Sequence, residues 1–578
     1  MSGSERRPGS DPRARVRETS ETNDRGNADE EWWKEAVVYQ VYPRSFNDAD
    51  GDGVGDLPGI LDRIDYLDDL GVDVVWLSPV YESPNADNGY DISDYRAIMA
   101  EFGTMADWEA VLDGLHDRGM RLVMDLAVNH TSDEHEWFRR SRDPDSTYHD
   151  WYHWVDGDPD EPPNDWESFF GGAAWSYDDE VGKWYLHLFD GRQPDLNWRN
   201  PDVREAVCDV MEWWLEKGID GFRMDVINLI SKPEGYPDGE REDVVVRGAD
   251  RFVNGPRLGE YLEELFEVVG RYDAMTVGEM VDMDIEQAVE FVGPEGAGMS
   301  MAFSFDHMRL DHGPAGRWDS REWTLGEFRE VIGEWQTGLH ERGWSSVFLG
   351  NHDQPRAVSR FGDDGEYREE SAKLLATLLF TLEGTPYVFQ GDEIGMTNYP
   401  WESLDEIRDV DTLRNVEVAR EAGRLEDGEV MELVRRRSRD NARTPMQWDD
   451  TEHAGFTSGE PWLPVNPNHE EVNVARDRAN RDSVWHYYRD LIELRGEHDV
   501  LIYGEYADLD AEHGRVWAYE RTLDDERAVV VLGFASEPVR FDPGSVGLRS
   551  DATYRIGNYP PPDDPATLRP YEARVYTD

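Results

Sequence analysis

Hydrophobic positions near the start of the chain switch repeatedly between a two-residue and a helical period. Alternating or continuous apolar runs predict strands, whereas apolar residues three and four apart predict helices. The expected elements, in order, are a strand at 37–42, a helix at 60–70, a strand at 72–77, a helix at 108–116 and a strand at 121–128. Gly71 and Gly119 follow the two helices and are typical C-terminal caps. This strand–helix alternation indicates βα units around a parallel sheet.

The alternation is interrupted once and later replaced. Residues 131–200 are rich in Trp, Asp, Pro and Gly, which indicates a small domain inserted after the third strand. A helix at 203–217 and a strand ending at Asp225 resume the pattern, and residues 233–260 and 400–440 are expected to be long excursions above the sheet. From about residue 505 short β-rich runs predict an antiparallel domain.

These patterns predict an α/β fold, a (β/α)8 TIM barrel with two additions. The expected division is a disordered acidic and polar tail at 1–30, the barrel at 31–130 and 201–504, the inserted subdomain at 131–200 and a C-terminal β-domain at 505–578. The tail is expected to be disordered because it has almost no apolar residues to bury.

The charge of the chain changes the picture of its surface. The formal net charge is −67 and the pI is about 4.4, yet the chain contains 22 Trp, 25 Tyr and 20 Phe. Disordered acidic chains lack such aromatic content, so a large core is expected beneath an acidic surface. The lysines are only Lys34, Lys183, Lys217, Lys232 and Lys373. We interpret this surface as adaptation to molar salt, where a Debye length of about 3 Å screens self-repulsion.

Composition also excludes several classes of function. An acidic surface repels phosphate, which argues against nucleic-acid binding. No apolar run of the length of a membrane span occurs, and no apolar segment follows Arg6 and Arg7, as an export signal would require. Cys208 is the only cysteine, so no disulfide can form within the chain. A cytoplasmic location fits these features, and the oligomeric state stays open.

Three carboxylates follow apolar, strand-like runs in the barrel region. Asp225 ends Gly-Phe-Arg-Met-Asp, Glu279 ends Thr-Val-Gly-Glu, and Asp353 ends Asn-His-Asp. The intervals of 54 (279 − 225) and 74 (353 − 279) residues equal one or two βα units. Strand ends of a (β/α)8 barrel converge at its C-terminal face. A lone Asp after a strand is usually a helix cap, but three such segments in order predict a shared site.

Two of these carboxylates suffice for retaining glycoside hydrolysis. We expect Asp225 to be the nucleophile, because an ionised carboxylate stabilises an oxocarbenium-like transition state and can bond to the anomeric carbon. Arg223 lies on the same side of the strand and would keep Asp225 ionised. Glu279 is the expected acid/base, with a pKa above that of Asp225.

The order and wording of these segments resemble the α-amylase family of glycoside hydrolases. The resemblance runs from Trp32 to the C-terminus and is closest to the oligo-1,6-glucosidase and α-glucosidase branch. Further matching phrases are Val-Tyr-Pro-Arg-Ser-Phe at 41–46, Tyr-Glu-Ser-Pro at 81–84, Asn-Gly-Tyr-Asp-Ile-Ser-Asp-Tyr at 88–95, Asp-Leu-Ala-Val-Asn-His at 125–130, Gln-Pro-Asp-Leu-Asn-Trp at 193–198 and Arg-Asp-Asn-Ala-Arg-Thr-Pro-Met-Gln-Trp at 439–448.

The resemblance implies roles for further residues. Asp353, with His352 beside it, would grip the sugar hydroxyls and steady the distorted ring, and His130 would donate to the sugar. Asp87 and Arg439 would clamp the non-reducing glucose and so enforce exo-action.

Two more residues would border the sugars. Tyr90 would stack on the clamped glucose. Val226, after the nucleophile, resembles members that cleave α-1,6 links, whereas Thr or Ala there is commoner in α-1,4 maltases; the alternative is that Val226 merely packs the barrel. The resemblance therefore implies a retaining exo-α-glucosidase for isomaltose and other short α-glucosides, with maltose open.

Two rival functions follow from the same resemblance. Residues 305–311 partly resemble the charged loop of the sucrose isomerases, but His312 stands where those enzymes carry a further Arg, which leaves isomerisation or glucosyl transfer open. A catalytically silent relative that acts as a binding subunit is the other rival, although such relatives lose the carboxylates that this chain keeps.

A Gly-rich acidic turn is a candidate metal site. Alternate carboxylates in such a turn present oxygens to one point, as Ca²⁺ requires. The turn resembles the first half of an EF-hand, but Gly59 stands at the twelfth position, and it also resembles a structural Ca²⁺ loop of this glucosidase branch. The expected ligands are Asp48, Asp50, Asp52, Asp56 and the carbonyl of Val54, with Mg²⁺ or Na⁺ as substitutes. The ion would be structural, because the chemistry needs no cofactor; the alternative is one more acidic stretch.

Overall fold

The computed structural model describes most of the chain. The described residues are 31–241, 244–294, 296–313, 316–421, 423, 427–509, 513–549 and 552–578. The predicted tail at 1–30 lies outside them.

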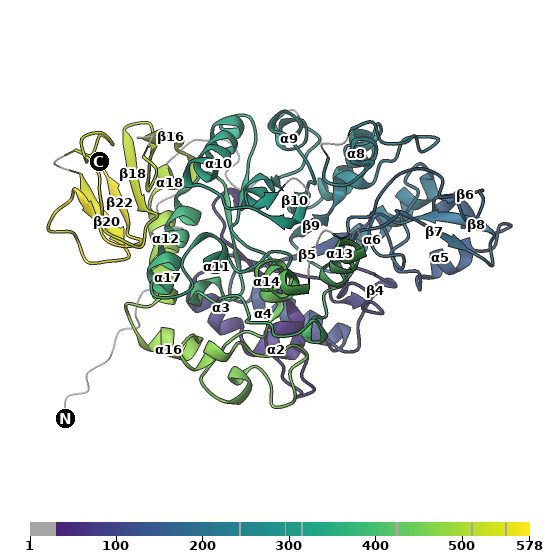
Figure 1. Cartoon of the computed structure of the whole chain (residues 1–578), viewed down its shortest axis with the longest axis horizontal. Helices are drawn as coiled ribbons and strands as arrows, with labels where there is room; N and C mark the ends of the chain where they lie inside the picture. The colour runs from purple at the N-terminus through teal and green to yellow at the C-terminus, as the bar shows by residue number, and fades with distance from the viewer. Residues whose placement is uncertain are drawn as a thin grey trace, which may run out of the picture.

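Eight parallel strands form a barrel at the centre of the molecule (Figure 1). Each strand pairs with its neighbours in chain order, and the last pairs with the first, Val38 lying opposite Tyr387. A parallel bridge from Ala302 to Ser345 links the sixth and seventh strands and completes the ring. The strands are β1 (Val38–Val41), β2 (Val74–Leu77), β5 (Arg121–Ala127), β9 (Gly221–Asp225), β10 (Met275–Glu279), β11 (Met301–Phe303), β14 (Ser346–Val347) and β15 (Thr385–Phe389).

Helices surround the strands because each has one apolar face and defined ends. In α4, Thr104 and Asp107 form a reciprocal capping box at the N-terminus, and Trp108, Val111 and Leu115 are buried against the barrel. The outer helices are α2 (Leu57–Asp62), α3 (Ile64–Leu70), α4 (Met105–His116), α6 (Pro201–Glu216), α8 (Leu258–Val269), α9 (Ile285–Val292), α10 (Leu325–Leu339), α11 (Ala357–Phe361), α12 (Arg368–Thr381), α17 (Val484–Glu497) and α18 (Asp499–Tyr503).

The single helix expected at 60–70 is wrong in one respect, because two short helices occupy this region. They meet at Arg63, which has φ −111° and ψ 4°. The Arg63 side chain donates to Asn47 Oδ1 at 3.0 Å and lies 4.1 Å from the Trp448 ring centroid. These tertiary contacts outweigh the local periodicity. Gly71, with φ 98°, caps α3 as the sequence predicts.

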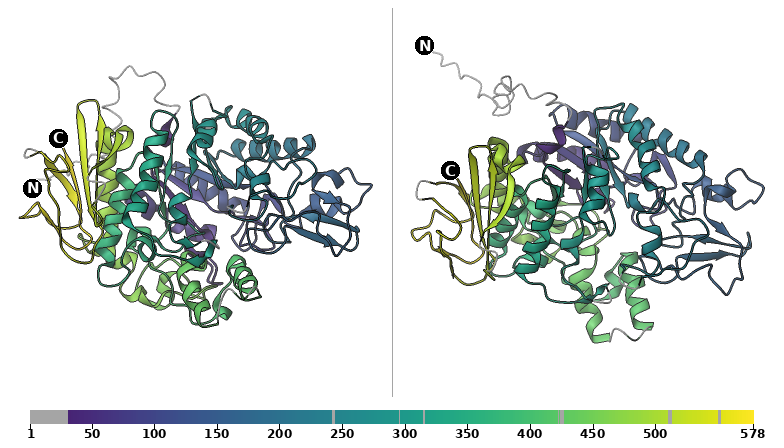
Figure 2. Two further views of the ribbon diagram at one scale, coloured as in Figure 1. Left: turned by 45° about the horizontal axis from the view of Figure 1, so that its top comes forward. Right: turned by 90° about the horizontal axis from the view of Figure 1, so that it is seen from above.

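Three excursions stand above the C-terminal ends of the strands. The first, after β5, contains α5 (Glu136–Ser141) and a small sheet in the order β6 (Trp154–Val155), β8 (Lys183–Leu186), β7 (Trp175–Asp178). The second, after β9, contains α7 (Ala249–Phe252). The third, after β15, carries the helices α13 (Val410–Glu421) and α14 (Asp427–Arg437), which project from the body in Figure 2. Small pairs are β3 (Tyr81–Glu82) with β4 (Asp94–Ile98) and β12 (His312–Gly313) with β13 (Gly316–Ser320).

A five-stranded antiparallel sheet closes the chain. Its order is β16 (Glu505–Leu509), β17 (Val516–Leu523), β18 (Glu526–Gly533), β22 (Ala573–Thr577), β20 (Thr553–Gly557), with β19 (Val539–Arg540) paired to β21 (Thr567–Leu568). Helix α12 contacts α17 on one side and β18 and β22 on the other, and its residues 371–381 are buried. A helix is expected to be buried on all sides where two layers cover it.

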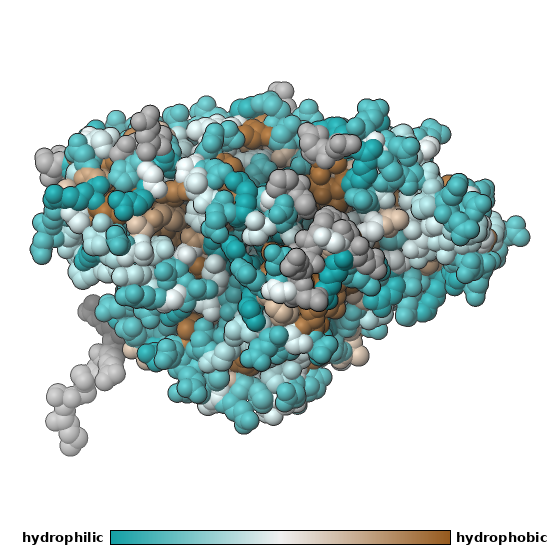
Figure 3. Space-filling model, in the orientation of Figure 1, coloured by the Kyte–Doolittle hydropathy of each residue, from teal (hydrophilic) through white to brown (hydrophobic). Residues whose placement is uncertain are grey.

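The predicted fold class is confirmed: a (β/α)8 barrel carries an insertion after its third strand and a C-terminal antiparallel sheet. The face shown in Figure 3 is mostly hydrophilic. Within the described part of the chain, every helix is too short or too polar to cross a membrane.

Candidate active site

The three predicted carboxylates lie at one end of the barrel. Asp225 is the last residue of β9, Glu279 is the last residue of β10, and Asp353 follows β14. The register pairs Met224 with Gly278, so Asp225 and Glu279 are neighbours at the same edge of two parallel strands. The barrel thus brings together groups that are far apart in the sequence.

Arg223 links the first two carboxylates. Its side chain is 1% exposed; Nη1 donates to Asp225 Oδ1 at 2.6 Å, and Nη2 forms an ion pair with Glu279. Nη1 also donates to Asp125 Oδ1 at 2.7 Å. Since neighbouring nitrogens of one guanidinium hold Asp225 and Glu279, their carboxyl groups face the same small space. This closeness fits a retaining pair, whose carboxyl groups lie about 5–5.5 Å apart.

The environment of Glu279 favours its protonated form. Burial is the main cause that raises its pKa well above the usual range, and it outweighs the opposing effect of Arg223. The charges of Asp225 and Asp353 raise it further. Glu279 can therefore hold a proton beside the carboxyl group of Asp225.

Asp353 has the opposite environment. Burial alone would raise its pKa, but the guanidinium groups of Arg439 and Arg443 hold it well below the usual range. Because burial lowers the pKa of His352 to about 3, that ring is neutral near pH 7, and the two arginines supply the positive charge. They donate to Asp353 Oδ1 at 3.2 Å from Arg439 Nη1 and 2.7 Å from Arg443 Nη2.

Asp87 and Arg439 meet beside Asp353. Arg439 Nη2 donates to Asp87 Oδ1 at 3.0 Å, and both residues are buried. Burial raises the pKa of Asp87 to about 7, against the lowering effect of Arg439. Gln193 Nε2 donates to Asp87 Oδ2 at 3.3 Å and lies 3.2 Å from His130 Nε2.

Tyr90 and His130 complete the wall of the site. The Tyr90 ring stacks on His352, with centroids 5.2 Å apart and planes 5° apart, and its hydroxyl donates to Asp125 Oδ2 at 3.0 Å. His130 Nε2 lies 3.2 Å from the Tyr90 carbonyl oxygen. These side chains come from other segments at the same end of the barrel: Asp87 and Tyr90 follow β2, His130 follows β5, and Arg439 follows β15. The predicted polar residues therefore form one compact cluster.

Comparison with known proteins assigns the chain that carries this cluster to a family. The model of the α-amylase catalytic domain matches residues 40–504. The chain belongs to the α-amylase family. The resemblance noted from the sequence motifs is thereby confirmed.

Relatives within the α-amylase family match almost end to end. An oligo-1,6-glucosidase of Parageobacillus thermoglucosidasius is 51% identical over 94% of this chain and 98% of its own length. An oligo-1,6-glucosidase of Bacillus cereus is 52% identical, over 95% and 99%. Among solved structures, an isomaltulose synthase from Klebsiella sp. LX3 is 43% identical with a TM-score of 0.91, covering 94% of this chain and 99% of that one.

Val226 follows Asp225 in an uncommon backbone conformation, with φ 38° and ψ 38°. Its side chain is 6% exposed and belongs to an apolar cluster with Leu229, Trp166 and Phe252. The backbone nitrogen lies 3.5 Å from Glu279 Oε2. This residue therefore adjoins the acid/base candidate while its side chain packs against the excursions above the barrel.

Three residues of the site were not singled out from the sequence. Asp125 and Arg443 lie inside family phrases quoted above, so a closer comparison of those phrases could have found them. Asp125 is fully buried and accepts from Arg223, Tyr90 and Trp76. Asp409, which contacts Arg439, lies in the excursion at 400–440, where no motif marked it.

The acidic turn lies between β1 and α2. Carboxylate oxygens of Asp48, Asp50 and Asp56 come within 4.8 Å of one another. Asp52 lies outside this group, and its Oδ1 accepts from the Val54 nitrogen at 2.9 Å instead. Burial raises the pKa of Asp56, and the Asp48 charge raises it further. Unbalanced negative charge of this kind suits a hard cation.

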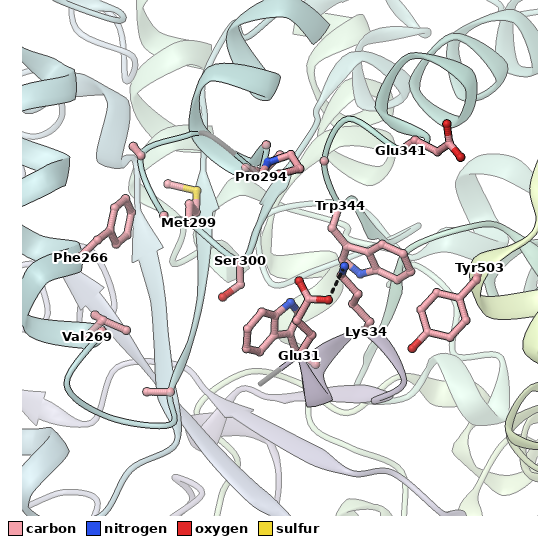
Figure 4. A pocket seen from close by; sticks show the side chains of 18 of the residues that line it. Glu31, Lys34, Phe266, Val269, Pro294, Met299, Ser300, Glu341, Trp344 and Tyr503 are labelled. Carbon is pink, nitrogen blue, oxygen red and sulfur yellow. Dashed lines mark hydrogen bonds and ion pairs between the residues drawn. The ribbon is translucent and has the colours of Figure 1, made fainter. Parts of the chain in front are cut away.

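A hollow of about 1420 Å³ lies at the opposite end of the barrel (Figure 4). Its walls include Trp33 and Lys34, which precede β1, Ser300, which precedes β11, and Trp344, which precedes β14. Lys34 Nζ forms an ion pair with Glu31 at 2.8 Å and lies 5.1 Å from the Trp344 ring centroid. None of the predicted site residues lines this hollow, so its size is unrelated to the carboxylate cluster.

Proposed function

We propose that this chain is a retaining exo-α-glucosidase that releases α-glucose from the non-reducing ends of short α-glucosides. The observation that carries the proposal is the arrangement of Asp225 and Glu279 on one guanidinium, with burial keeping the pKa of Glu279 high. An ionised nucleophile beside a protonated acid is the requirement of the retaining mechanism.

The reaction would proceed in two displacements. Asp225 attacks the anomeric carbon while Glu279 protonates the leaving oxygen, which gives a covalent glucosyl–enzyme and a free sugar. Glu279, now ionised, takes a proton from water, which attacks the same carbon and releases α-glucose and Asp225. Asp353, held ionised by Arg439 and Arg443, would hydrogen-bond to sugar hydroxyls and stabilise the positive charge at the ring.

The paired Asp87 and Arg439 support exo-action. A glucose residue whose outer hydroxyls bond to this pair has no room for a further sugar on that side, so cleavage removes one glucose at a time. The relatives named oligo-1,6-glucosidase support α-1,6 links as the preferred substrates.

Val226 would contribute to linkage preference. A hydroxyl added at nearly constant volume changes pocket discrimination by roughly 1–3 kcal/mol, about 10–200-fold in kcat/KM. We expect isomaltose to be preferred over maltose, and Val226→Thr to shift the ratio toward maltose. The measurement is kcat/KM for both disaccharides in both variants at one salt concentration; a wild-type preference for maltose, or an unchanged ratio, would leave Val226 with packing alone.

A second candidate function is sucrose isomerisation or glucosyl transfer with the same carboxylates. The structural likeness to an isomaltulose synthase favours it, whereas His312 at a position where those enzymes carry Arg disfavours it. Incubation with sucrose separates the two: glucose and fructose in equal amounts indicate hydrolysis, and isomeric disaccharides indicate transfer.

The setting of the enzyme is a further part of the proposal. The five lysines all lie within the described residues, and none of them is exposed. Together with the net charge of −67, this supports an acidic surface adapted to concentrated salt. The proposed location is the cytoplasm. The turn at 48–56 would hold a structural Ca²⁺, or Mg²⁺ or Na⁺ in its place, through Asp48, Asp50 and Asp56.

A further inference from the structure

Asp409 lies outside every motif quoted from the sequence, yet its carboxylate contacts Arg439. Arg439 and Asp87 together form the proposed glucose clamp. It stands directly before α13 and accepts from the backbone nitrogens of Asp411 and Thr412 at 3.1 and 3.2 Å, as a helix cap does. The side chain is fully buried. A cap alone would not require burial, so the other contacts of this carboxylate decide its role.

The main partner of Asp409 is Arg439. Asp409 Oδ1 accepts from Arg439 Nε at 2.8 Å and lies 2.7 Å from Nη2, while Oδ2 accepts from the Arg439 backbone nitrogen at 3.3 Å. The remaining donor directions of this guanidinium go to Asp87 at 3.0 Å and Asp353 at 3.2 Å. Asp409 therefore binds the guanidinium through Nε and Nη2. Nη2 and Nη1 of the same group donate to the proposed sugar-binding residues Asp87 and Asp353.

The charge on Asp409 is secure despite its burial. Burial alone would raise its pKa, but Arg439 and Arg443 hold the pKa well below the usual range. Charge-assisted hydrogen bonds of this kind are about twice as strong as neutral ones and fix the plane of a guanidinium. Without this carboxylate, the Arg439 guanidinium would lose its contacts through Nε and Nη2 and would be free to rotate away from the orientation in which it meets Asp87 and Asp353.

We propose that Asp409 is a positioning residue for the glucose clamp. It fixes the Arg439 guanidinium through Nε and Nη2, and it thereby connects the start of α13 to the side chain that contacts Asp87 and Asp353. Asp409 itself does not reach the reacting atoms. This inference rests on the proposed function, since the clamp has a role only if the site binds a glucosyl group.

The test compares Asp409→Asn with a matched control. Asp405→Asn removes the same charge from the same segment, but at an exposed position. Loss of a hydrogen bond to a charged group corresponds to roughly a 10- to 100-fold weakening of binding. We expect Asp409→Asn to raise KM for isomaltose and the inhibition constant of glucose by this factor together, with a smaller change in kcat, and Asp405→Asn to change neither.

A purely structural role would give a different result. In that case Asp409→Asn would lower the melting temperature, and it would lower kcat because a smaller fraction of the enzyme is active. KM for isomaltose and the inhibition constant of glucose would stay unchanged. This outcome would overturn the proposal. If Asp409→Asn does not fold, Thr412→Val serves instead, because the Thr412 hydroxyl donates to Asp409 Oδ2. Thr412→Val should raise KM for isomaltose and the inhibition constant of glucose, each by a smaller factor than Asp409→Asn would. If neither constant changes, the proposal is again overturned.

Glucose binding also separates this inference from the proposed function. Calorimetry with Asp225→Asn as background measures the clamp without turnover, and adding Asp409→Asn should weaken glucose binding by the same factor. Equal glucose affinity in the two proteins would refute the positioning role while leaving the hydrolase proposal intact. A wild type that hydrolyses no α-glucoside would refute the hydrolase proposal itself.

Discussion

Glu279 keeps a raised pKa even though it contacts the Arg223 guanidinium. Burial is the main cause, and it outweighs the lowering effect of Arg223 so that the pKa lies well above the usual range. A general acid must carry its proton at the working pH, so a raised pKa extends activity upward in pH. Activity should then be lost as the pH rises through the pKa of Glu279, above the ordinary range of a glutamate.

Glu279→Gln should separate protonation of the leaving group from nucleophilic attack. A disaccharide needs the proton, so its kcat/KM should fall by about 10²–10⁴-fold, whereas an aryl glucoside with an acidic leaving group should lose far less in the first step. The high-pH limb of the profile should also disappear. Glu286→Gln, at an exposed position on α9, is the control. Equal losses for both substrates would show that Glu279 is not the acid.

Among individual residues, those inside spaced motifs could be predicted, and those held by tertiary contacts could not. Asp225, Glu279 and Asp353 are recognisable because each ends a short apolar run. Asp409 is not, because its partner Arg439 is distant in the sequence and only the folded chain brings them to 2.7 Å. Burial, which sets the pKa of Glu279, is likewise a property of the folded site.

At the scale of elements, local pattern predicted the barrel because each strand and helix has its own apolar period and cap. It failed where a tertiary contact intervened, as at Arg63, whose contacts with Asn47 and Trp448 coincide with the break between α2 and α3. The excursion that carries α13 has no such regular pattern. Its contact with the glucose clamp, from Asp409 to Arg439, forms only when the barrel is closed.

The turn at 48–56 allows a prediction at the same scale. Three carboxylates within 4.8 Å repel one another unless a cation lies between them. A cation that binds the folded state at about 100 times its Kd contributes about 2.7 kcal/mol to the free energy of unfolding. Chelation should therefore lower the melting temperature, and Ca²⁺ should restore it, with little change in kcat of the folded enzyme.

Asp50→Asn should abolish this calcium effect, whereas Asp62→Asn, at an exposed position on the neighbouring helix, should preserve it. A melting temperature that is independent of Ca²⁺ and chelator in the wild type would leave the turn as an ordinary acidic loop.

At the scale of the whole molecule, the formal net charge of −67 opposes the compact state in dilute buffer. Salt weakens this repulsion because the Debye length falls from about 10 Å at 0.1 M to about 3 Å at 1 M. The melting temperature should rise steeply from about 0.1 M to several molar KCl. An uncharged osmolyte at equal osmolality should have a smaller effect; equal melting temperatures at low and high KCl would contradict salt adaptation.

Asp225 should form a covalent bond to glucose in a retaining reaction. A mechanism-based fluoroglucoside forms the glucosyl–enzyme but slows its hydrolysis, so the intermediate accumulates. Mass spectrometry of a digest should locate one added fluoroglucosyl group on the peptide that ends β9, at Asp225, and Asp225→Asn should take up no label and lose several orders of magnitude in kcat. Labelling at another residue, or near-normal activity in Asp225→Asn, would contradict the account.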